Sequence, residues 1–289
     1  MMDGKRLETL LAHAERILAR LEAVLPGPAS PPDWNAAHAF LWRHHHGRMF
    51  LQPVVRPSVI RLRDLRNIDE QKKRIERNTR QFLAGRHANN VLLTGARGSG
   101  KSSLVKALLD EYAPQGLRVI EVDKNDLADL PEIMELLAER PERFIVFCDD
   151  LSFDESEAAY KALKSALDGS ISGLADNVLI YATSNRRHLM PEYHDDNTLT
   201  RHIDGEIHPA EAVEEKVSLS DRFGLWLSFY PFGQDEYLEI AAHWLKVFGV
   251  SKDRIQKAHQ DALQWALLRG SRSGRVAWQF ARDFAGRAE

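Results

Sequence analysis

The fold is decided by residues 89–102, which are Asn-Asn-Val-Leu-Leu-Thr-Gly-Ala-Arg-Gly-Ser-Gly-Lys-Ser. Residues 91–94 form an apolar run typical of a buried strand, and residues 95–102 follow the pattern glycine, four residues, Gly-Lys-Ser. Glycines let the backbone curl so that consecutive N–H groups face a phosphate, and a helix starting near Lys101 adds the positive end of its dipole. The stretch predicts a P-loop between a strand and a helix.

Two side chains of this loop have the chemistry that ATP with Mg²⁺ requires. We expect the Lys101 ammonium to reach the β- and γ-phosphates and the Ser102 hydroxyl to coordinate Mg²⁺. The expected nucleotide contacts in this segment are Gly95, Ala96, Arg97, Gly98, Ser99, Gly100, Lys101, Ser102 and Ser103.

Beyond the P-loop, short apolar strands alternate with helical segments. The expected strands are residues 91–94, 117–122, 144–148, 178–183 and 225–229. Residues 144–148 are apolar on both faces, which places them in the middle of a parallel sheet. After Pro231 only helices are expected, at 234–248, 252–268 and 274–285. This order predicts an α/β domain with helices on both faces of its sheet, followed by a small all-α domain.

The N-terminal segment has a different pattern. Apolar residues recur at helical spacing over residues 7–25, and a proline- and glycine-rich linker follows at 26–32. This amphipathic helix either packs on its own domain or docks on a partner. Residues 44–46 are three histidines, but successive residues point in different directions, so we expect a solvated basic turn and no zinc site.

Composition limits the possible functions. The formal net charge of −3 means that the whole molecule does not attract nucleic acid. Residues 61–80 are locally basic, with eight basic and four acidic side chains, which indicates a solvated helix face or a surface for phosphate backbones. The single cysteine, Cys148, is expected in the core and excludes an intramolecular disulfide. With no long apolar run and no signal peptide, we expect no membrane association and a cytoplasmic location.

Polar residues follow the third and fourth expected strands. Asp149 and Asp150 end the third strand, at the edge where open α/β sheets bind ligands. We expect Asp149 to hold Mg²⁺, and Asp150 either to polarise the attacking water or to cap the next loop. Asn185 follows the fourth strand and could orient water beside the γ-phosphate, although an isolated asparagine is a weak signal. Arg222 and Arg275 could each stabilise the charge that develops on a transferred phosphoryl group, because a guanidinium is planar and always ionised. Taken alone, each arginine could equally be a surface ion-pair partner.

Taken in order, these features resemble the AAA+ ATPases over roughly residues 60–285. The matching positions, in order, are Gly95–Ser102 for Walker A, Phe144–Asp150 for Walker B, Asn185 for sensor 1, Arg222 for the arginine finger and Arg275 for sensor 2. The chain is most similar to a bacterial group of single-module ATPases catalogued as a domain of unknown function. Residues 82–85, 89–95 and 148–153 carry that closer similarity.

The resemblance implies a five-stranded parallel sheet of order 5-1-4-3-2 with a C-terminal helical lid. We therefore expect a helical extension and linker at 1–57, the nucleotide-binding domain at 58–231 and the lid at 232–289. It also implies that the segment Leu65-Arg66-Asn67-Ile68 lies against the adenine; the alternative is that this segment is plain core and turn. Arg222 would act on the nucleotide of a neighbouring subunit, which implies a homo-oligomer. Arg275 would act on the nucleotide of its own subunit.

One departure from the family pattern bears on function. The family usually has glutamate where this chain has Asp150, whose carboxylate sits about 1.5 Å further back, on the order of one C–C bond. We expect an ATP-driven remodeller or loader of an unidentified protein or nucleic-acid client. The departure instead favours a nucleotide-gated switch with little hydrolysis. A small-molecule kinase shares the P-loop but has no need of the lid, and residues 192–215 suggest no role.

Overall fold

The computed structural model describes most of the chain between residues 32 and 287. The described residues are 13–17, 32–45, 48–57, 60–152, 158–168, 176–185, 201–203, 206–208 and 219–287. Most of the expected N-terminal helix lies outside them, although residues 13–17 are helical and exposed. Residues 192–215 also lie outside, apart from an antiparallel pair of short strands, β7 (Arg201–Ile203) and β8 (Glu206–His208). In the described part of the chain, no helix has both the length and the apolar character needed to cross a membrane.

The core of the molecule is a seven-stranded sheet in the order β2-β1-β4-β5-β6-β3-β9. Its strands are β1 (Ala39–His45), β2 (Arg48–Pro53), β3 (Val91–Gly95), β4 (Leu117–Glu121), β5 (Arg143–Cys148), β6 (Val178–Ser184) and β9 (Leu225–Phe229). All neighbours pair in parallel except β1 and β2, which form an antiparallel hairpin. The parallel α/β fold is thus confirmed.

The predicted five strands and the predicted order were wrong for the sheet as a whole. The five expected strands are neighbours, as β9-β3-β6-β5-β4, but the β1–β2 hairpin extends the sheet beyond β4. Residues 39–45 and 48–53 are therefore strands of the sheet, where a helical extension was predicted. His44 lies in a strand, where a turn was predicted. The physical reason is period-2 burial, because Phe40 and Trp42 point into the core while Arg43 is exposed.

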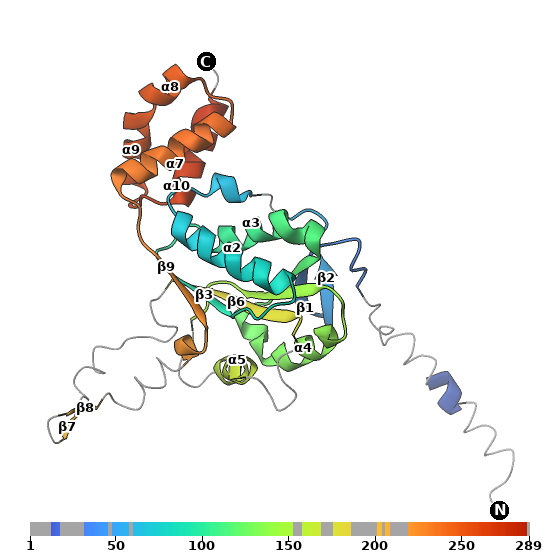
Figure 1. The fold of residues 1–289 in the computed structure, drawn as a ribbon. Helices are drawn as coiled ribbons and strands as arrows, with labels where there is room; N and C mark the ends of the chain where they lie inside the picture. The colour runs from blue at the N-terminus through green and yellow to red at the C-terminus, as the bar shows by residue number, and fades with distance from the viewer. Residues whose placement is uncertain are drawn as a thin grey trace, which may run out of the picture.

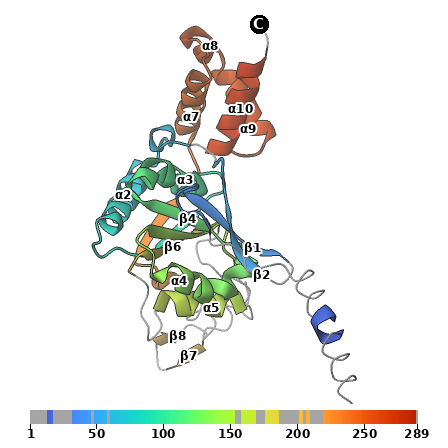
Figure 2. The same cartoon turned by 90° about the vertical axis from the view of Figure 1, so that its right-hand side faces the viewer.

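Helices cover both faces of the sheet (Figures 1 and 2). One face carries α2 (Asp69–Leu83) and α3 (Lys101–Tyr112), and the other carries α4 (Leu130–Ala138) and α5 (Ala158–Asp168). Three short 3₁₀ helices lie between these elements: η1 (Leu62–Asp64), η2 (Ala113–Gln115) and η3 (Lys124–Asp129). The sheet is buried on both sides, which explains why all seven residues of β6 are inaccessible.

Four further helices form a separate lobe beside the sheet edge at which the P-loop lies (Figure 1). They are α7 (Gln234–Val247), α8 (Lys252–Lys257), α9 (His259–Leu268) and α10 (Gly274–Gly286). Tyr237 and Phe280 are fully buried between them. We call this lobe the helical domain.

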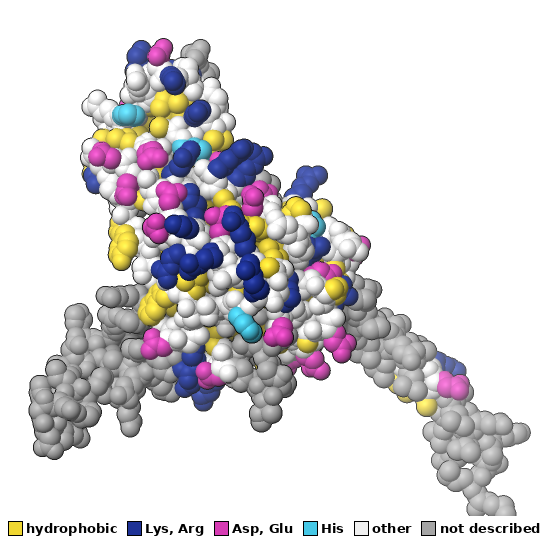
Figure 3. All heavy atoms as spheres, viewed as in Figure 1, with side chains coloured by type: hydrophobic (Ala, Val, Ile, Leu, Met, Phe, Trp, Pro, Cys, Tyr) yellow, Lys and Arg dark blue, Asp and Glu magenta, His cyan; other side chains and the backbone are white. Residues whose placement is uncertain are grey.

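Helix α2 accounts for much of the basic run at residues 61–80. It buries Ile75 and Phe82 against the sheet and leaves Lys73, Arg74 and Arg77 exposed. Lys and Arg side chains accordingly gather on the face of the molecule seen in Figure 3. This distribution matches the expected solvated helix face.

Candidate nucleotide-binding site

The P-loop leaves β3 at Gly95, where only glycine fits. A Cβ at this position would lie 1.9 Å from the Phe229 carbonyl oxygen, and the backbone φ is +122°. The next N–H group, that of Ala96, donates to the same carbonyl at 3.2 Å. The start of the loop is therefore packed tightly against β9, and α3 begins six residues later at Lys101.

Lys101 is held inside the loop by three oxygen atoms. Its Nζ donates to the carbonyls of Gly95 and Ala96, each at 2.8 Å, and to Asn185 Oδ1 at 3.0 Å. The residue is only 6% exposed. Burial lowers the pKa of Lys101 to about 8, although the nearby Asp149 carboxylate opposes this shift. A buried ammonium whose hydrogen-bond partners are neutral oxygens would be stabilised by the negative charge of a bound phosphate.

Ser102 and Asp149 meet as a magnesium site requires. Ser102 Oγ donates to Asp149 Oδ1 at 2.6 Å, which joins the first turn of α3 to the end of β5. A hydroxyl beside a carboxylate is a donor set that Mg²⁺ uses in P-loop sites. The two residues fit a magnesium ion that would also contact the phosphates.

Thr183 ties together the two acidic residues at the end of β5. Its Oγ1 donates to Asp149 Oδ1 at 2.5 Å and accepts from the Asp150 N–H at 2.9 Å. Thr183 is 1% exposed, so these bonds are shielded from water. Thr183 was not predicted from the sequence, although a polar side chain at the end of a buried strand, close to Asn185, was a usable signal.

Asp150 is the more exposed carboxylate of the pair. Its φ of +55° is left-handed, which is uncommon for a residue other than glycine and concentrates at functional sites. Asn185 Nδ2 donates to Asp150 Oδ1, while Asn185 Oδ1 accepts from Lys101. Arg97 lies 3.9 Å from the other carboxylate oxygen of Asp150, and both side chains are solvent-accessible. Asn185 thus connects the P-loop lysine to the candidate general base.

These groups line one cavity of about 880 Å³ between the P-loop and the helical domain. Its polar end contains Lys101, Ser102, Asp149, Asp150, Asn185 and Arg275. Its other end is lined mainly by apolar side chains, with Asp64 and Arg66 beside them. The apolar side chains are those of Ile60, Leu65, Ile68, Ile240, Trp244, Phe248 and Trp278. The volume is within the range of small-molecule sites, and the division into a polar and an apolar end suits a phosphate chain joined to a flat base.

The helical domain contacts the P-loop directly. The Gly274 N–H donates to the Gly98 carbonyl at 2.9 Å, at the start of α10. Gly98 has a φ of +71°, and a Cβ there would lie 2.8 Å from Ser273 Oγ. This close approach places Arg275, in the first turn of α10, beside the polar end of the cavity.

A second link joins the two parts of the molecule at the apolar end. His243 of α7 contacts Asp64 Oδ1 through Nε2 at 3.1 Å, and both side chains are about one-seventh exposed (14% and 15%). The Arg66 guanidinium lies 3.4 Å from His243 Nδ1. The sequence analysis missed this link, because its partners are separated by more than 170 positions.

Arg222 lies outside the cavity. It follows Leu219–Ser220 and precedes β9, and its guanidinium pairs with Asp168 at the end of α5. It does not line the space around Lys101. Its suggested action on a neighbouring subunit stays a prediction.

Both the sequence and the fold of this chain have similarities to known proteins. A family described as "Protein of unknown function (DUF815)" matches residues 35–288. A RuvB variant from Thermotoga maritima is 16% identical with a TM-score of 0.50, and the alignment covers 74% of this chain and 60% of that chain, less than two thirds of its length. No curated protein matches.

Two further solved structures are similar at lower TM-scores. The E. coli MS115-1 HORMA:CdnC:Trip13 complex has 12% identity, a TM-score of 0.48, and coverage of 77% of this chain and 90% of that chain. The replication initiator DnaA bound to AMPPCP and single-stranded DNA has 16% identity, a TM-score of 0.47, and coverage of 75% and 61%. The family match and the RuvB likeness together confirm the AAA+ P-loop fold.

Proposed function

This chain belongs to the DUF815 family, and we propose that it is a Mg²⁺-dependent AAA+ ATPase that couples ATP binding and hydrolysis to remodelling or loading a protein or nucleic-acid client. The observation that carries the proposal is the convergence on one cavity of polar groups from the P-loop, the ends of β5 and β6, and α10. A P-loop lysine, a hydroxyl and a carboxylate for Mg²⁺, and an arginine are the groups that recur in sites for nucleoside triphosphates.

The roles follow from the contacts. Lys101 exchanges its carbonyl partners for phosphate oxygens, and the P-loop N–H groups bind the rest of the chain. Ser102 and Asp149 hold Mg²⁺, which when bound neutralises phosphate charge. Asp150 accepts the proton of the attacking water, and Asn185 positions that carboxylate relative to Lys101.

The helical domain, residues 232–289, acts as the lid. Arg275 binds phosphate in its own subunit, and Ile68 with its apolar neighbours holds the adenine. Arg222 lies away from its own cavity, which supports an arginine finger that serves a neighbour in a homo-oligomer.

The test is ATP binding and turnover in matched variants of the full chain. Lys101→Ala should lose ATP binding and hydrolysis while remaining folded. Asp150→Asn should bind ATP within a few-fold of the original chain while turnover falls by about 100-fold. Lys161→Ala is the control, because Lys161 is exposed on α5 and does not line the cavity. Unchanged ATPase in a folded Lys101→Ala protein would contradict the assignment.

A nucleotide-gated switch is the second candidate, and the short Asp150 side chain favours it. The Asp150 carboxylate is bound by Asn185 and lies near Arg97, so water must compete with these partners for it. The switch predicts ATP binding of ordinary strength with turnover that stays low whether or not a client is present. Client-stimulated hydrolysis would instead support the remodeller.

A further inference from the structure

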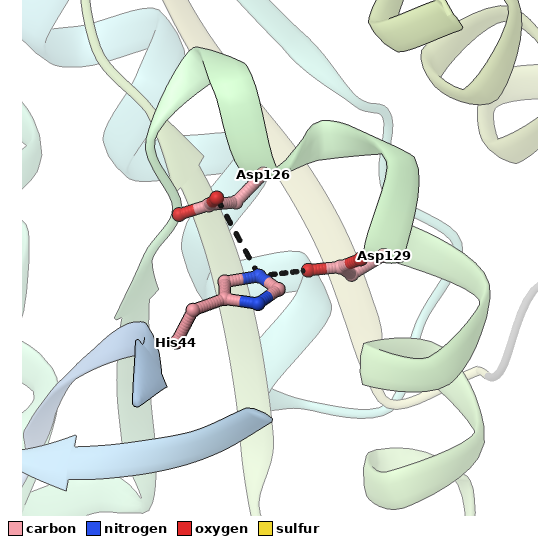
Figure 4. A group of neighbouring side chains, drawn as sticks. All are labelled: His44, Asp126 and Asp129. Carbon is pink, nitrogen blue, oxygen red and sulfur yellow. Dashed lines mark hydrogen bonds and ion pairs between the residues drawn. The ribbon is translucent and has the colours of Figure 1, made fainter. Parts of the chain in front are cut away.

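Three side chains of types that bind metals lie together where the β1–β2 hairpin meets the core. His44 is near the end of β1, and Asp126 and Asp129 are in η3 (Figure 4). Strand β1 pairs with β4 only through residues 39–41, so its later residues extend past the end of β4. They reach η3, the segment that follows β4 in the chain. None of the three residues lines the nucleotide cavity.

The two carboxylates converge on one imidazole nitrogen. His44 Nε2 lies 2.7 Å from Asp129 Oδ2 and 3.5 Å from Asp126 Oδ1 (Figure 4). The side chains are partly shielded, with 44% of His44, 25% of Asp126 and 18% of Asp129 exposed. An Nε2 atom carries at most one hydrogen, so His44 can donate through it to only one carboxylate at a time. A divalent cation at this point would neutralise both.

Trp42 fixes the orientation of one of these carboxylates. Its Nε1–H donates to Asp129 Oδ2 at 2.8 Å, and the Trp42 ring is 4% exposed. Residues 42 and 44 point to the same face of β1, because side chains on a strand alternate. An outer hydrogen bond that orients a carboxylate ligand is a regular feature of protein metal sites, and its loss weakens binding by about 10–100-fold.

From this geometry we propose that His44, Asp126 and Asp129 form a binding site for a divalent transition-metal ion of the zinc type. One imidazole nitrogen and two carboxylate oxygens are ligands that zinc accepts, and water can complete the coordination from the exposed side. Tetrahedral bonds of about 2.0–2.1 Å put ligand atoms about 3.3 Å apart, close to the 3.5 Å between His44 and Asp126. The 2.7 Å between His44 Nε2 and Asp129 Oδ2 is shorter than this, so the two side chains must move apart when the ion binds.

The bound ion joins two parts of the fold that are far apart in sequence. It connects the hairpin at the sheet edge to η3 and through it to α4, which begins at residue 130. Its role is structural and independent of the proposed ATPase. Zinc binding should therefore raise the melting temperature without a nucleotide present.

The test is zinc binding to the nucleotide-free full chain after chelator treatment. Calorimetric titration with Zn²⁺ should show one site, and Co²⁺ should give the visible absorption of a tetrahedral site. His44→Ala and Asp126→Asn should each lower Zn²⁺ affinity at least ten-fold, and Trp42→Phe by about ten-fold. His87→Ala is the control, because His87 is exposed and lies outside the cluster.

Asp126→Asn also protects the test against misfolding, because it alters a partly exposed side chain and leaves β1 intact. Cys148 does not compete for the ion, since it is fully buried and its pKa is raised to about 12 by that burial. The proposal is overturned if the original chain binds no zinc. It is also overturned if His44→Ala and Asp126→Asn bind zinc with the same affinity, and the same rise in melting temperature, as the original chain. The cluster would then be a histidine–aspartate ion-pair network only.

Discussion

Thr183→Val is the most informative perturbation of the proposed ATPase site. Valine keeps the β-branched shape of this buried side chain but removes the hydroxyl that bonds to both Asp149 and Asp150. A hydrogen bond to a charged group contributes about 1.5–3 kcal/mol and a neutral one about 0.5–1.5 kcal/mol. Asp149 keeps its bond from Ser102, so we expect the free energy of unfolding to fall by roughly 2–3 kcal/mol.

The effect on catalysis should exceed the effect on ATP affinity. Without Thr183 Oγ1, the end of β5 loses the contact that joins the Asp149 carboxylate to the Asp150 backbone N–H. A misplacement of about 1 Å costs on the order of 100-fold in rate, so kcat should fall by ~10–100-fold with KM within a few-fold. Steady-state ATPase measurements, with unfolding by urea in parallel, separate the two effects.

Thr94→Val is the matched control. Thr94 is also a buried strand threonine, and its Oγ1 accepts from Trp226 Nε1 at 2.9 Å, but it does not line the cavity. Thr94→Val should lose about 0.5–1.5 kcal/mol of stability, the value of one neutral hydrogen bond, and keep its kcat. Thr183→Ser should retain most activity. Equal kcat values for Thr183→Val and Thr94→Val would refute the positioning argument.

Four further predictions concern this site and the subunit contact proposed for Arg222. Asp150→Glu should raise kcat if the short carboxylate limits hydrolysis, whereas a fall in single-turnover rate would show that the backbone already compensates. Because the pKa of Lys101 is lowered in the folded state, the unfolded chain binds more protons between pH 8 and 10.5. The unfolding free energy of the nucleotide-free protein should therefore rise with pH across that window, and this rise should be missing in Lys101→Met. Arg275→Ala should weaken nucleotide binding to the monomer, as measured with a fluorescent ATP analogue. Arg222→Ala should leave nucleotide binding intact and lower turnover only at protein concentrations where subunits associate. Mixing Arg222→Ala with Lys101→Ala should restore part of the activity. If activity per subunit does not depend on protein concentration, the shared site is contradicted.

Much of the phosphate end of this site was predictable from the sequence because its signals are local. The P-loop is a continuous stretch in which each glycine meets a backbone requirement, as the 1.9 Å approach at Gly95 shows. Residues at the ends of parallel strands are brought to one edge by the topology, so Asp149 and Asn185 could be placed near Lys101 without coordinates. The strand–helix alternation determined the parallel α/β class in the same way.

Tertiary structure alone decided which distant segments pair. The hairpin of β1 and β2 joins the sheet beside β4, and nothing in the period of residues 39–53 specifies that edge. The same holds for His243 with Asp64, and for His44 with η3. Local periodicity shows which side of a strand or helix is buried, but the partner it is buried against depends on the packing of the whole chain.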